Sequence, residues 1–145
     1  MSDVFSKAKR SAVMSRIKSR GNKDTELVLA KLLRANQITG WRRHWEVRIK
    51  NAECRSFRVR PDFVFRSARL ALFVDGCFWH GCPRHATKPK TNCAFWNKKL
   101  AGNRARDLRV NRTLRRAGWK VIRIWECQLR QKPLVCLARI RHFLR

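Results

Sequence analysis

The chain has 145 residues, a length typical of one domain that can bury a hydrophobic core, and 44% of them are hydrophobic, which excludes wholesale disorder. It carries 36 Lys and Arg against 9 Asp and Glu, and this net charge of +27 favours a polyanionic partner, nucleic acid before a membrane surface. No apolar run approaches the roughly 18 residues of a membrane-spanning helix, and no apolar core of a secretion signal is seen, so we expect a cytoplasmic protein.

The N-terminal third predicts an arm followed by a helix. Residues 1–21 are basic and weakly amphipathic, which is typical either of an arm along a phosphate backbone or of a disordered tail. Residues 22–145 are expected to form the single domain. Its first helix would run from a cap at Asn22 or Asp24 to about Asn36. Glu26 lies in the first turn, where the helix dipole alone favours a carboxylate.

The middle of the chain predicts three strands. Residues 40–49 and 57–65 alternate between apolar and polar side chains, with Pro61 at an edge or bulge and a polar loop between them. Residues 70–74 are continuously apolar. Asp62 lies among the apolar residues of the second strand, where a buried carboxylate is costly unless it is paired or binds a cation.

The rest of the chain predicts a polar loop at 75–85, a basic connector, a long helix at 94–117, a strand at 119–125 and a last helix that Pro133 opens. Gly118 suits the residue after the end of the long helix. Helical spacing places Asp107 on the inward face of that helix, an unusual position for an acid. The order of elements predicts an α/β fold, with a mixed central sheet flanked by helices.

The segment FVDGCFWHGCPRH, at Phe73–His85, concentrates reactive side chains. Clustered Cys and His in a reducing compartment favour a metal over disulfides, and their spacing here is that of a structural zinc site. The expected ligands are Cys77, Cys82, His85 and Cys127. Cys127 is chosen because its strand would lie beside residues 70–74, and Cys93 and Cys54 are the alternatives.

A second metal is expected where Asp62 and Asp75 end neighbouring strands. Two carboxylates, or one with a backbone carbonyl such as that of Val74, suit Mg²⁺, which stabilises charge on a phosphodiester. His80 follows as a candidate general base that Asp107 would orient. The alternative for His80 is a further zinc ligand.

Three aromatic residues form another group. Phe78 and Trp79 lie in the ligand-bearing loop, and Trp96 lies near the start of the long helix. Aromatic wedges unstack a base step, and a mismatched step yields most easily. Packing around the zinc site is the alternative.

The chain from about Met14 to Leu129 resembles the very short patch repair (Vsr) DNA mismatch endonucleases. The matching segments are Met14-Ser-Arg-Ile, the helix with Glu26, RPDF at Arg60–Phe63, FVDGCFWHGCPRH at Phe73–His85, FWNKKLAGNRARD at Phe95–Asp107 and GWKVIRIWEC at Gly118–Cys127.

The resemblance implies a restriction-endonuclease-like fold, related to the PD-(D/E)xK nucleases, in a monomeric bacterial-type enzyme of the nucleoid. It implies Mg²⁺-dependent nicking 5′ to the T of a T·G mismatch in double-stranded DNA, with a 5′-phosphate and a 3′-hydroxyl as products. By resemblance Asp62 binds Mg²⁺, His80 is the general base paired with Asp107, and Glu26 supports them. The zinc positions match Cys77, Cys82, His85 and Cys127. The DNA-contacting positions match Met14, Phe78, Trp79, Trp96, Lys99 and Asn103.

Two alternatives remain open at this point. One is a homing or restriction-type nickase without mismatch selectivity, and the other is a zinc-containing nucleic-acid-binding protein without activity. Some members of the family carry His where this chain has Asp75, so Asp75 is expected either to bind metal or to position water.

Overall fold

The computed structural model describes residues 6, 8–9, 25–53, 55–84 and 90–145. Most of the expected basic arm at 1–21, with Met14, lies outside the described residues, and so do Cys54 and His85. Among the helices of the described part, none has both the length and the apolar character needed to cross a bilayer.

The centre of the molecule is a four-stranded mixed sheet in the order β1-β4-β5-β6. The strands are β1 (Trp41–Arg43), β4 (Phe63–Phe65), β5 (Leu70–Asp75) and β6 (Lys120–Trp125). β4 pairs antiparallel with β1 and with β5, whereas β5 and β6 are parallel, with Asp75 opposite Trp125. The expected pairing of the strand at 119–125 with that at 70–74 is therefore confirmed, as is the mixed sheet.

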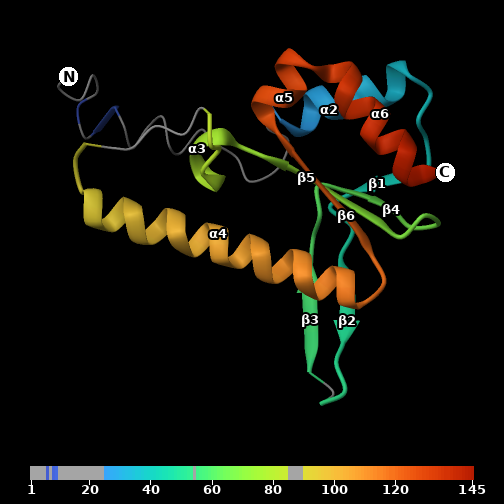
Figure 1. Ribbon diagram of the computed structural model, residues 1–145, viewed down its shortest axis with the longest axis horizontal. Coiled ribbons are helices and arrows are strands. Elements are labelled where there is room, and N and C mark those ends of the chain that lie inside the picture. Colours follow the sequence, from blue (N-terminus) through green and yellow to red (C-terminus); the bar gives the residue numbers. More distant parts are fainter. Residues whose placement is uncertain (1–5, 7, 10–24, 54, 85–89) are drawn as a thin grey trace.

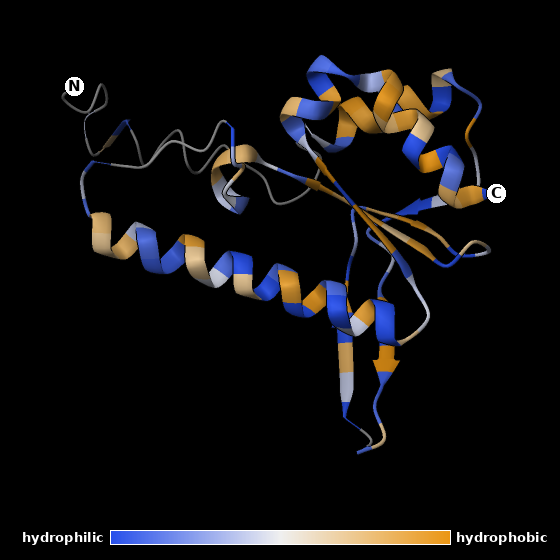
Figure 2. Cartoon of the chain, in the orientation of Figure 1, coloured by the Kyte–Doolittle hydropathy of each residue, from blue (hydrophilic) through white to orange (hydrophobic). Residues whose placement is uncertain are grey.

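Both faces of this sheet are covered (Figure 1). On one face, Leu70 and Leu72 of β5 pack with α2 (Glu26–Ala35), α5 (Glu126–Gln131) and α6 (Pro133–Leu144). On the other face, Ala71 packs with Leu114 of α4 (Cys93–Arg116). Two-sided burial explains why β5 is continuously apolar rather than alternating. Figure 2 shows β4, β5 and β6 as largely apolar, whereas the edge strand β1 and most of α4 are hydrophilic. Leu114 is the buried residue of α4.

Two of the expected strands are each divided into two strands in the structure, so the prediction of single strands there is wrong. The segment expected at 40–49 divides into β1 and β2 (Val47–Lys50), and that at 57–65 divides into β3 (Ser56–Val59) and β4. His44 has a left-handed φ of 52°, which ends β1, and Pro61 has no amide hydrogen for a ladder. β2 and β3 consequently pair as a separate two-stranded sheet.

The helix limits also differ from expectation. α2 begins after Thr25, not after Asn22 or Asp24. The loop expected at 75–85 contains a short helix, α3 (Cys77–His80), and the residues after β6 continue as α5. The long helix is confirmed within a residue at each end, and Gly118 follows it with a φ of 83°.

Candidate active site and metal site

A cleft of about 780 Å³ opens where β5 ends, between the start of α2, the base of the β2–β3 hairpin and α4. All of the expected catalytic side chains line it. They are Glu26, Asp62, Asp75, His80 and Asp107. Residues far apart in the sequence thus meet at one edge of the sheet.

Asp62 lies at the start of β4, not at the end of a strand as expected. It still adjoins the end of β5, because β4 and β5 run antiparallel. The amide of Val74 donates a 2.7 Å hydrogen bond to Asp62 Oδ2. The Val74 backbone was expected to contribute its carbonyl to this site, and the contact with Asp62 that the structure shows is made by its N–H.

Glu26, His44 and Asp62 form the first cluster of ligand-type side chains, with one donor atom from each within 4.8 Å of the others. Glu26 is 4% exposed, although an acid in a first turn is usually solvated. Arg43 donates a 2.8 Å hydrogen bond to Glu26 Oε2. His44 Nε2 lies 2.8 Å from the same oxygen, but without hydrogen-bond alignment, so this buried atom has no hydrogen-bond partner in the described part of the chain.

The electrostatics of this cluster favour a cation. Burial, together with the neighbouring Glu26 carboxylate, raises the pKa of Asp62 to about 7, against the opposing effect of the hydrogen bond from Val74. Two carboxylates forced together share a proton unless a positive ion replaces it. Hard carboxylate oxygens are the ligands that Mg²⁺ prefers. The residues present therefore fit a magnesium ion on Asp62.

Asp75, His80 and Asp107 form the second cluster. The expected contact between His80 and Asp107 is present, with Nδ1 2.6 Å from Oδ2. Burial disfavours the charged imidazole, but Asp107 and Asp75 outweigh it and raise the pKa of His80. Burial acts to raise the pKa of Asp107, but the bond with His80 and the charge of Arg123 hold it below its usual value. The pair fixes the tautomer of His80, so Nε2 is the nitrogen left to exchange a proton.

Arg123 is a member of the site that sequence reasoning missed. Its Nη1 donates to both oxygens of Asp75, at 2.8 and 3.1 Å, and its Nη2 lies 3.5 Å from Asp107 Oδ1. Its guanidinium also covers the ring of Phe73 at 4.2 Å. The available signal was an Arg inside the apolar strand WKVIRIW, since a buried cation needs an acid beside it.

The Arg123 contact changes the setting of Asp75. Burial raises the pKa of Asp75, whereas Arg123 and His80 counteract that rise. Its carboxylate is 5% exposed and is already engaged by a guanidinium. Of the two expected acids, Asp62 therefore has the surroundings that fit a metal ion better.

Of the expected aromatic residues, Phe78 and Trp79 line the cleft, and Trp96 packs against both of them. Their ring centroids lie 5.1 to 5.9 Å apart, and Phe95, which is 60% exposed, extends the group at 5.3 Å from Trp96. Asn103 donates a 3.0 Å hydrogen bond to the Trp79 carbonyl. The structure thus places the Asn103 amide against α3, while Lys99 is exposed on α4.

Three of the four expected zinc ligands lie together in the described part of the chain. Cys77, Cys82 and Cys127 are buried, and their sulfur atoms all lie within 4.8 Å of one another. The Sγ atoms of Cys82 and Cys127 are 3.8 Å apart, the separation of about 3.8 Å expected for thiolates bound at about 2.3 Å to one tetrahedral centre. Burial raises the pKa of Cys77 to about 12, and a bound cation is what would hold such a thiol ionised.

The alternative ligand Cys93 does not join this cluster. It is exposed at the start of α4, where its thiol contacts the carbonyl of Lys90 at 3.2 Å. The pairing of β5 with β6 explains the choice of Cys127, because it places the residues after both strands at the same edge. The expected ligand His85 and the alternative Cys54 lie outside the described residues.

The chain is similar in sequence to a known family and to several known proteins. The profile of the family "DNA mismatch endonuclease Vsr" matches residues 2–86. The "DNA mismatch endonuclease Vsr" of Escherichia coli is 38% identical over 133 residues, which cover 90% of this chain and 77% of that protein. The "Type II nicking enzyme V.NmeAIP" of Neisseria meningitidis is 34% identical over 100% of this chain and 96% of its own length.

A third relative, the "Type II nicking enzyme V.NaeI" of Lentzea aerocolonigenes, is 44% identical over 87 residues, 60% of this chain. That match spans about half, 52%, of the length of the relative. The family profile covers more than half of this chain and the relative from E. coli spans nearly all of it, so the alternative of a non-enzymatic binder is set aside. The chain belongs to the Vsr family and is a DNA endonuclease.

Proposed function

We propose that this enzyme nicks one strand of double-stranded DNA on the 5′ side of the T in a T·G mismatch, and that it requires Mg²⁺. The observation that carries the proposal is the cleft itself, in which the Glu26–Asp62 carboxylates lie beside the His80–Asp107 pair. The name of the relative from E. coli, a mismatch endonuclease, supports the choice of substrate.

Asp62 is the residue that would hold the magnesium ion, with Glu26 beside it. When bound, the ion supplies positive charge to the phosphodiester and to its leaving oxygen. Arg43 neutralises Glu26 at 2.8 Å, which leaves Asp62 as the carboxylate with the stronger need for a cation. The Val74 amide fixes the orientation of Asp62 at the edge of the sheet.

His80 is the proton-transfer group in this proposal. Asp107 binds Nδ1 and so directs Nε2 as the atom that takes a proton from the attacking water. Arg123 approaches Asp107 at Oδ1, the oxygen that the imidazole does not bind. It binds Asp75 through both carboxylate oxygens, and Oδ1 of Asp75 also lies 3.7 Å from His80 Nδ1. Asp75 in this arrangement positions the proton-transfer group and its water, and Arg123 occupies the place that a metal would need on it.

Zinc is proposed as a structural ion on Cys77, Cys82 and Cys127, with His85 as the fourth ligand. The Cys cluster joins the start of α3 to the start of α5, so the ion would brace the turn that carries Phe78 and Trp79. The aromatic group would then enter the mismatched base step as a stiff wedge.

The broader architecture follows from these roles. We propose a restriction-endonuclease-like fold, related to the PD-(D/E)xK nucleases, in which residues 22–145 act as one monomeric endonuclease domain and residues 1–21, with Met14, contact DNA. The mixed sheet with its acids at one edge supports this reading. Lys99, which is exposed on α4, would face the phosphates. Asn103, the other expected DNA contact on this helix, would act next to it by holding the Trp79 carbonyl in place.

A nicking enzyme without mismatch selectivity is the second candidate. The names of the relatives from N. meningitidis and L. aerocolonigenes, type II nicking enzymes, favour it. The same Glu26, Asp62, His80 and Asp107 would serve, so the catalytic residues do not separate the two candidates.

A strand-resolved nicking assay separates them. End-labelled duplexes with a central T·G, C·G or T·A pair are incubated with the enzyme, with and without Mg²⁺, and the products are sized on a denaturing gel. We expect one cut in the T-containing strand of the T·G duplex, only with Mg²⁺. Equal cutting of the three duplexes would favour the second candidate, and cutting in the absence of any divalent ion would contradict the role of Asp62.

A further inference from the structure

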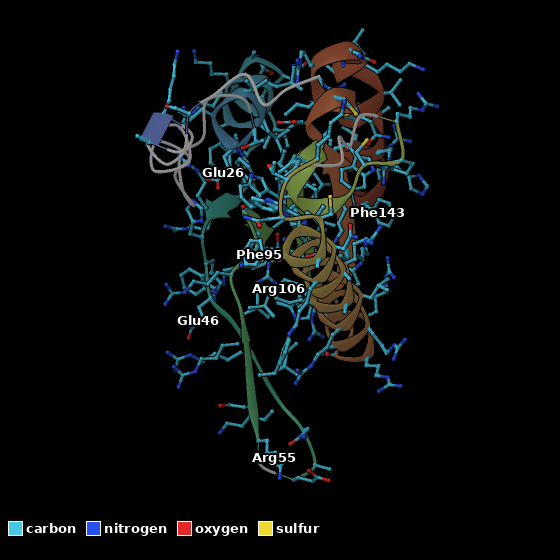
Figure 3. The ribbon with its side chains drawn as sticks, turned by 90° about the vertical axis from the view of Figure 1, so that its left-hand side faces the viewer. Glu26, Glu46, Arg55, Phe95, Arg106 and Phe143 are labelled. Carbon is cyan, nitrogen blue, oxygen red and sulfur yellow. The ribbon has the colours of Figure 1, made fainter. Side chains whose placement is uncertain are left out.

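The β2–β3 hairpin stands away from the main sheet as a two-stranded ribbon below α4 (Figure 1). Its strands are antiparallel, with Val47 opposite Val59 and Lys50 opposite Ser56. Figure 3 shows Arg55 at the far end of this ribbon, well away from Glu26 and Arg106. The roles described above for the cleft do not need this projection.

One face of the ribbon anchors it. Val47 and Val59 are buried and pack with Leu114 of α4 and with the main sheet, and Ile49 and Phe57 are partly buried against the same cluster. The guanidinium of Arg109 on α4 lies 5.6 Å from the ring of Phe57. The base of the hairpin is therefore fixed to the rigid part of the molecule.

The opposite face is exposed and basic. Arg48, Lys50 and Arg58 alternate with the apolar residues, and Arg48 stands directly opposite Arg58. Like charges at directly paired positions destabilise a hairpin. Glu46 binds Arg48 at 2.6 Å and Arg60 at 3.0 Å, whereas Arg58 makes no ion pair within the described residues. Stabilisation of the hairpin therefore does not explain why positive charges gather on this face. A bound polyanion would neutralise these charges.

The basic face is continuous with the cleft. Arg58 and Arg60 line the cleft beside Asp62. Arg60 and Arg55 flank β3 and are five residue steps apart, roughly 17 Å at about 3.4 Å per step. This is about five nucleotides of one strand at about 3.4 Å each. The major groove of B-DNA admits a two-stranded ribbon.

We propose that the β2–β3 hairpin is a second DNA-binding element, which holds the duplex beside the nicked phosphate out to about five base pairs. The inference rests on the proposed function, since it takes the cleft as the place of cutting. Arg48, Lys50 and Arg55 contact phosphates along the flank, and the ribbon enters or borders the groove there. Recognition of the sequence that flanks the mismatch would then involve this hairpin.

The test compares two triple variants of the full chain that lose the same charge. One carries Arg48→Gln, Lys50→Gln and Arg55→Gln, and none of these residues lines the cleft. The control carries Arg130→Gln, Arg141→Gln and Arg145→Gln, all exposed on α5, on α6 and at the C-terminus. Circular dichroism and thermal unfolding establish that both fold. Binding to a duplex with a central T·G pair is measured by anisotropy at several salt concentrations, in Ca²⁺ to prevent cutting.

We expect the hairpin variant to bind about 10-fold to 100-fold more weakly, with the slope of log K against log salt reduced by about 2 to 3. The control variant should stay within about 3-fold. Two shortened duplexes add a geometric test. Each of them ends two base pairs beyond the nick, one on the first side of the nick and the other on the opposite side. Shortening at one of the two ends should weaken the wild type by the same factor and leave the hairpin variant unchanged.

Equal affinities of the hairpin and control variants, or indifference of the wild type to shortening at both ends, would overturn the proposal while leaving the nicking activity intact. A wild type that does not nick the T·G duplex in Mg²⁺ would instead contradict the proposed function, and the hairpin role with it.

Discussion

Asp62 lies in surroundings that disfavour its charged form. Burial and the nearby Glu26 raise its pKa to about 7, against about 3.9 for an unfolded chain. The metal-free folded protein therefore holds a proton that the unfolded chain releases as the pH rises. Its stability should fall between about pH 4 and pH 7, because the folded state binds more protons there.

Asp62→Asn should remove this contribution. Between pH 5 and pH 8 the free energy of unfolding of the wild type, measured with urea, should fall more than that of the variant, by on the order of 1–3 kcal/mol. Adding Mg²⁺ at pH 8 should stabilise the wild type but not the variant, since the ion replaces the proton. The exposed substitution Glu53→Gln is the control. Identical pH profiles for wild type and Asp62→Asn would contradict the paired-carboxylate account.

The Asp62→Asn variant also tests whether Asp62 acts in cutting the DNA or in binding it. Nicking of the T·G duplex should fall by about three orders of magnitude or more, because the ligand for the catalytic ion is lost. Binding of the same duplex should change by less than about 3-fold, since the basic surface and the aromatic group are untouched. A parallel loss of binding would show that Asp62 contributes to DNA affinity rather than to cutting.

Arg123 offers a second test, of stability. Replacing it by Met leaves the Asp75 carboxylate, 5% exposed, without its guanidinium partner. Breaking a buried ion pair at one end typically costs about 3–5 kcal/mol. Urea unfolding should show a loss of this order, and the double variant Asp75→Asn with Arg123→Met should recover a large part of it.

The control is Arg112→Met, on an exposed position of α4, which should change the free energy of unfolding by no more than about 0.5 kcal/mol. A loss below about 1 kcal/mol for Arg123→Met would mean that Asp75 has another partner.

At the scale of elements, the site depends on short segments that join the sheet to its helices. α3 spans four residues after the end of β5, begins with Cys77 of the Cys cluster and carries Phe78, Trp79 and His80. Asn103 of α4 holds the Trp79 carbonyl from the other side. The short helix has too few hydrogen bonds to persist alone, so a zinc ion at its first residue would fix its position.

Cys82→Ser should therefore lower both zinc content and stability. Elemental analysis of the purified wild type should find about one zinc per chain, and the variant should hold much less and unfold at a clearly lower temperature, since a structural site contributes folding energy. Cys93→Ser is the matched control, because that thiol is exposed and outside the cluster. A wild type without zinc and as stable as its zinc-loaded form would refute the structural metal.

Local patterns predicted some elements well and others poorly. β5, β6 and α4 followed from continuous apolar runs and from helical spacing, and the pairing of β5 with β6 brings Cys127 close to Cys77 and Cys82, as expected. The divided strands did not follow, because alternation of apolar and polar residues does not reveal the left-handed backbone at His44 that ends β1. Arg123 was missed since its partners come from two other elements. The placement of Asp62 came from the antiparallel register, which one sequence does not specify.

For the whole molecule, charge is the dominant property. A net charge of +27 must raise the affinity for any nucleic acid, matched or mismatched. Under the proposed function, selectivity for a mismatch has to come from the cost of opening a base step, which the aromatic group would meet more easily at a T·G pair. Affinity and selectivity would then depend on different parts of the surface.

Salt should separate the two contributions. Binding to a matched duplex should weaken by about 10³-fold or more between 50 and 200 mM salt, as for proteins that make 6 or more phosphate contacts. The ratio of affinities for T·G and matched duplexes should change little over the same range, because wedge insertion releases few counterions. Anisotropy titrations check both. If the ratio of affinities for T·G and matched duplexes falls with salt as steeply as the affinity itself, the selectivity would come from charge instead.

The central claim is that the ion needed for cutting sits on Asp62 beside the His80–Asp107 pair. The most direct measurement is anomalous diffraction from Mn²⁺ in crystals of the enzyme bound to a T·G duplex. The account predicts a Mn²⁺ peak about 2.1–2.2 Å from an Asp62 oxygen, with a phosphate oxygen among its other ligands. A peak on Asp75 and Asp107 with Arg123 displaced, or DNA in the cleft with no ion on Asp62, would contradict it.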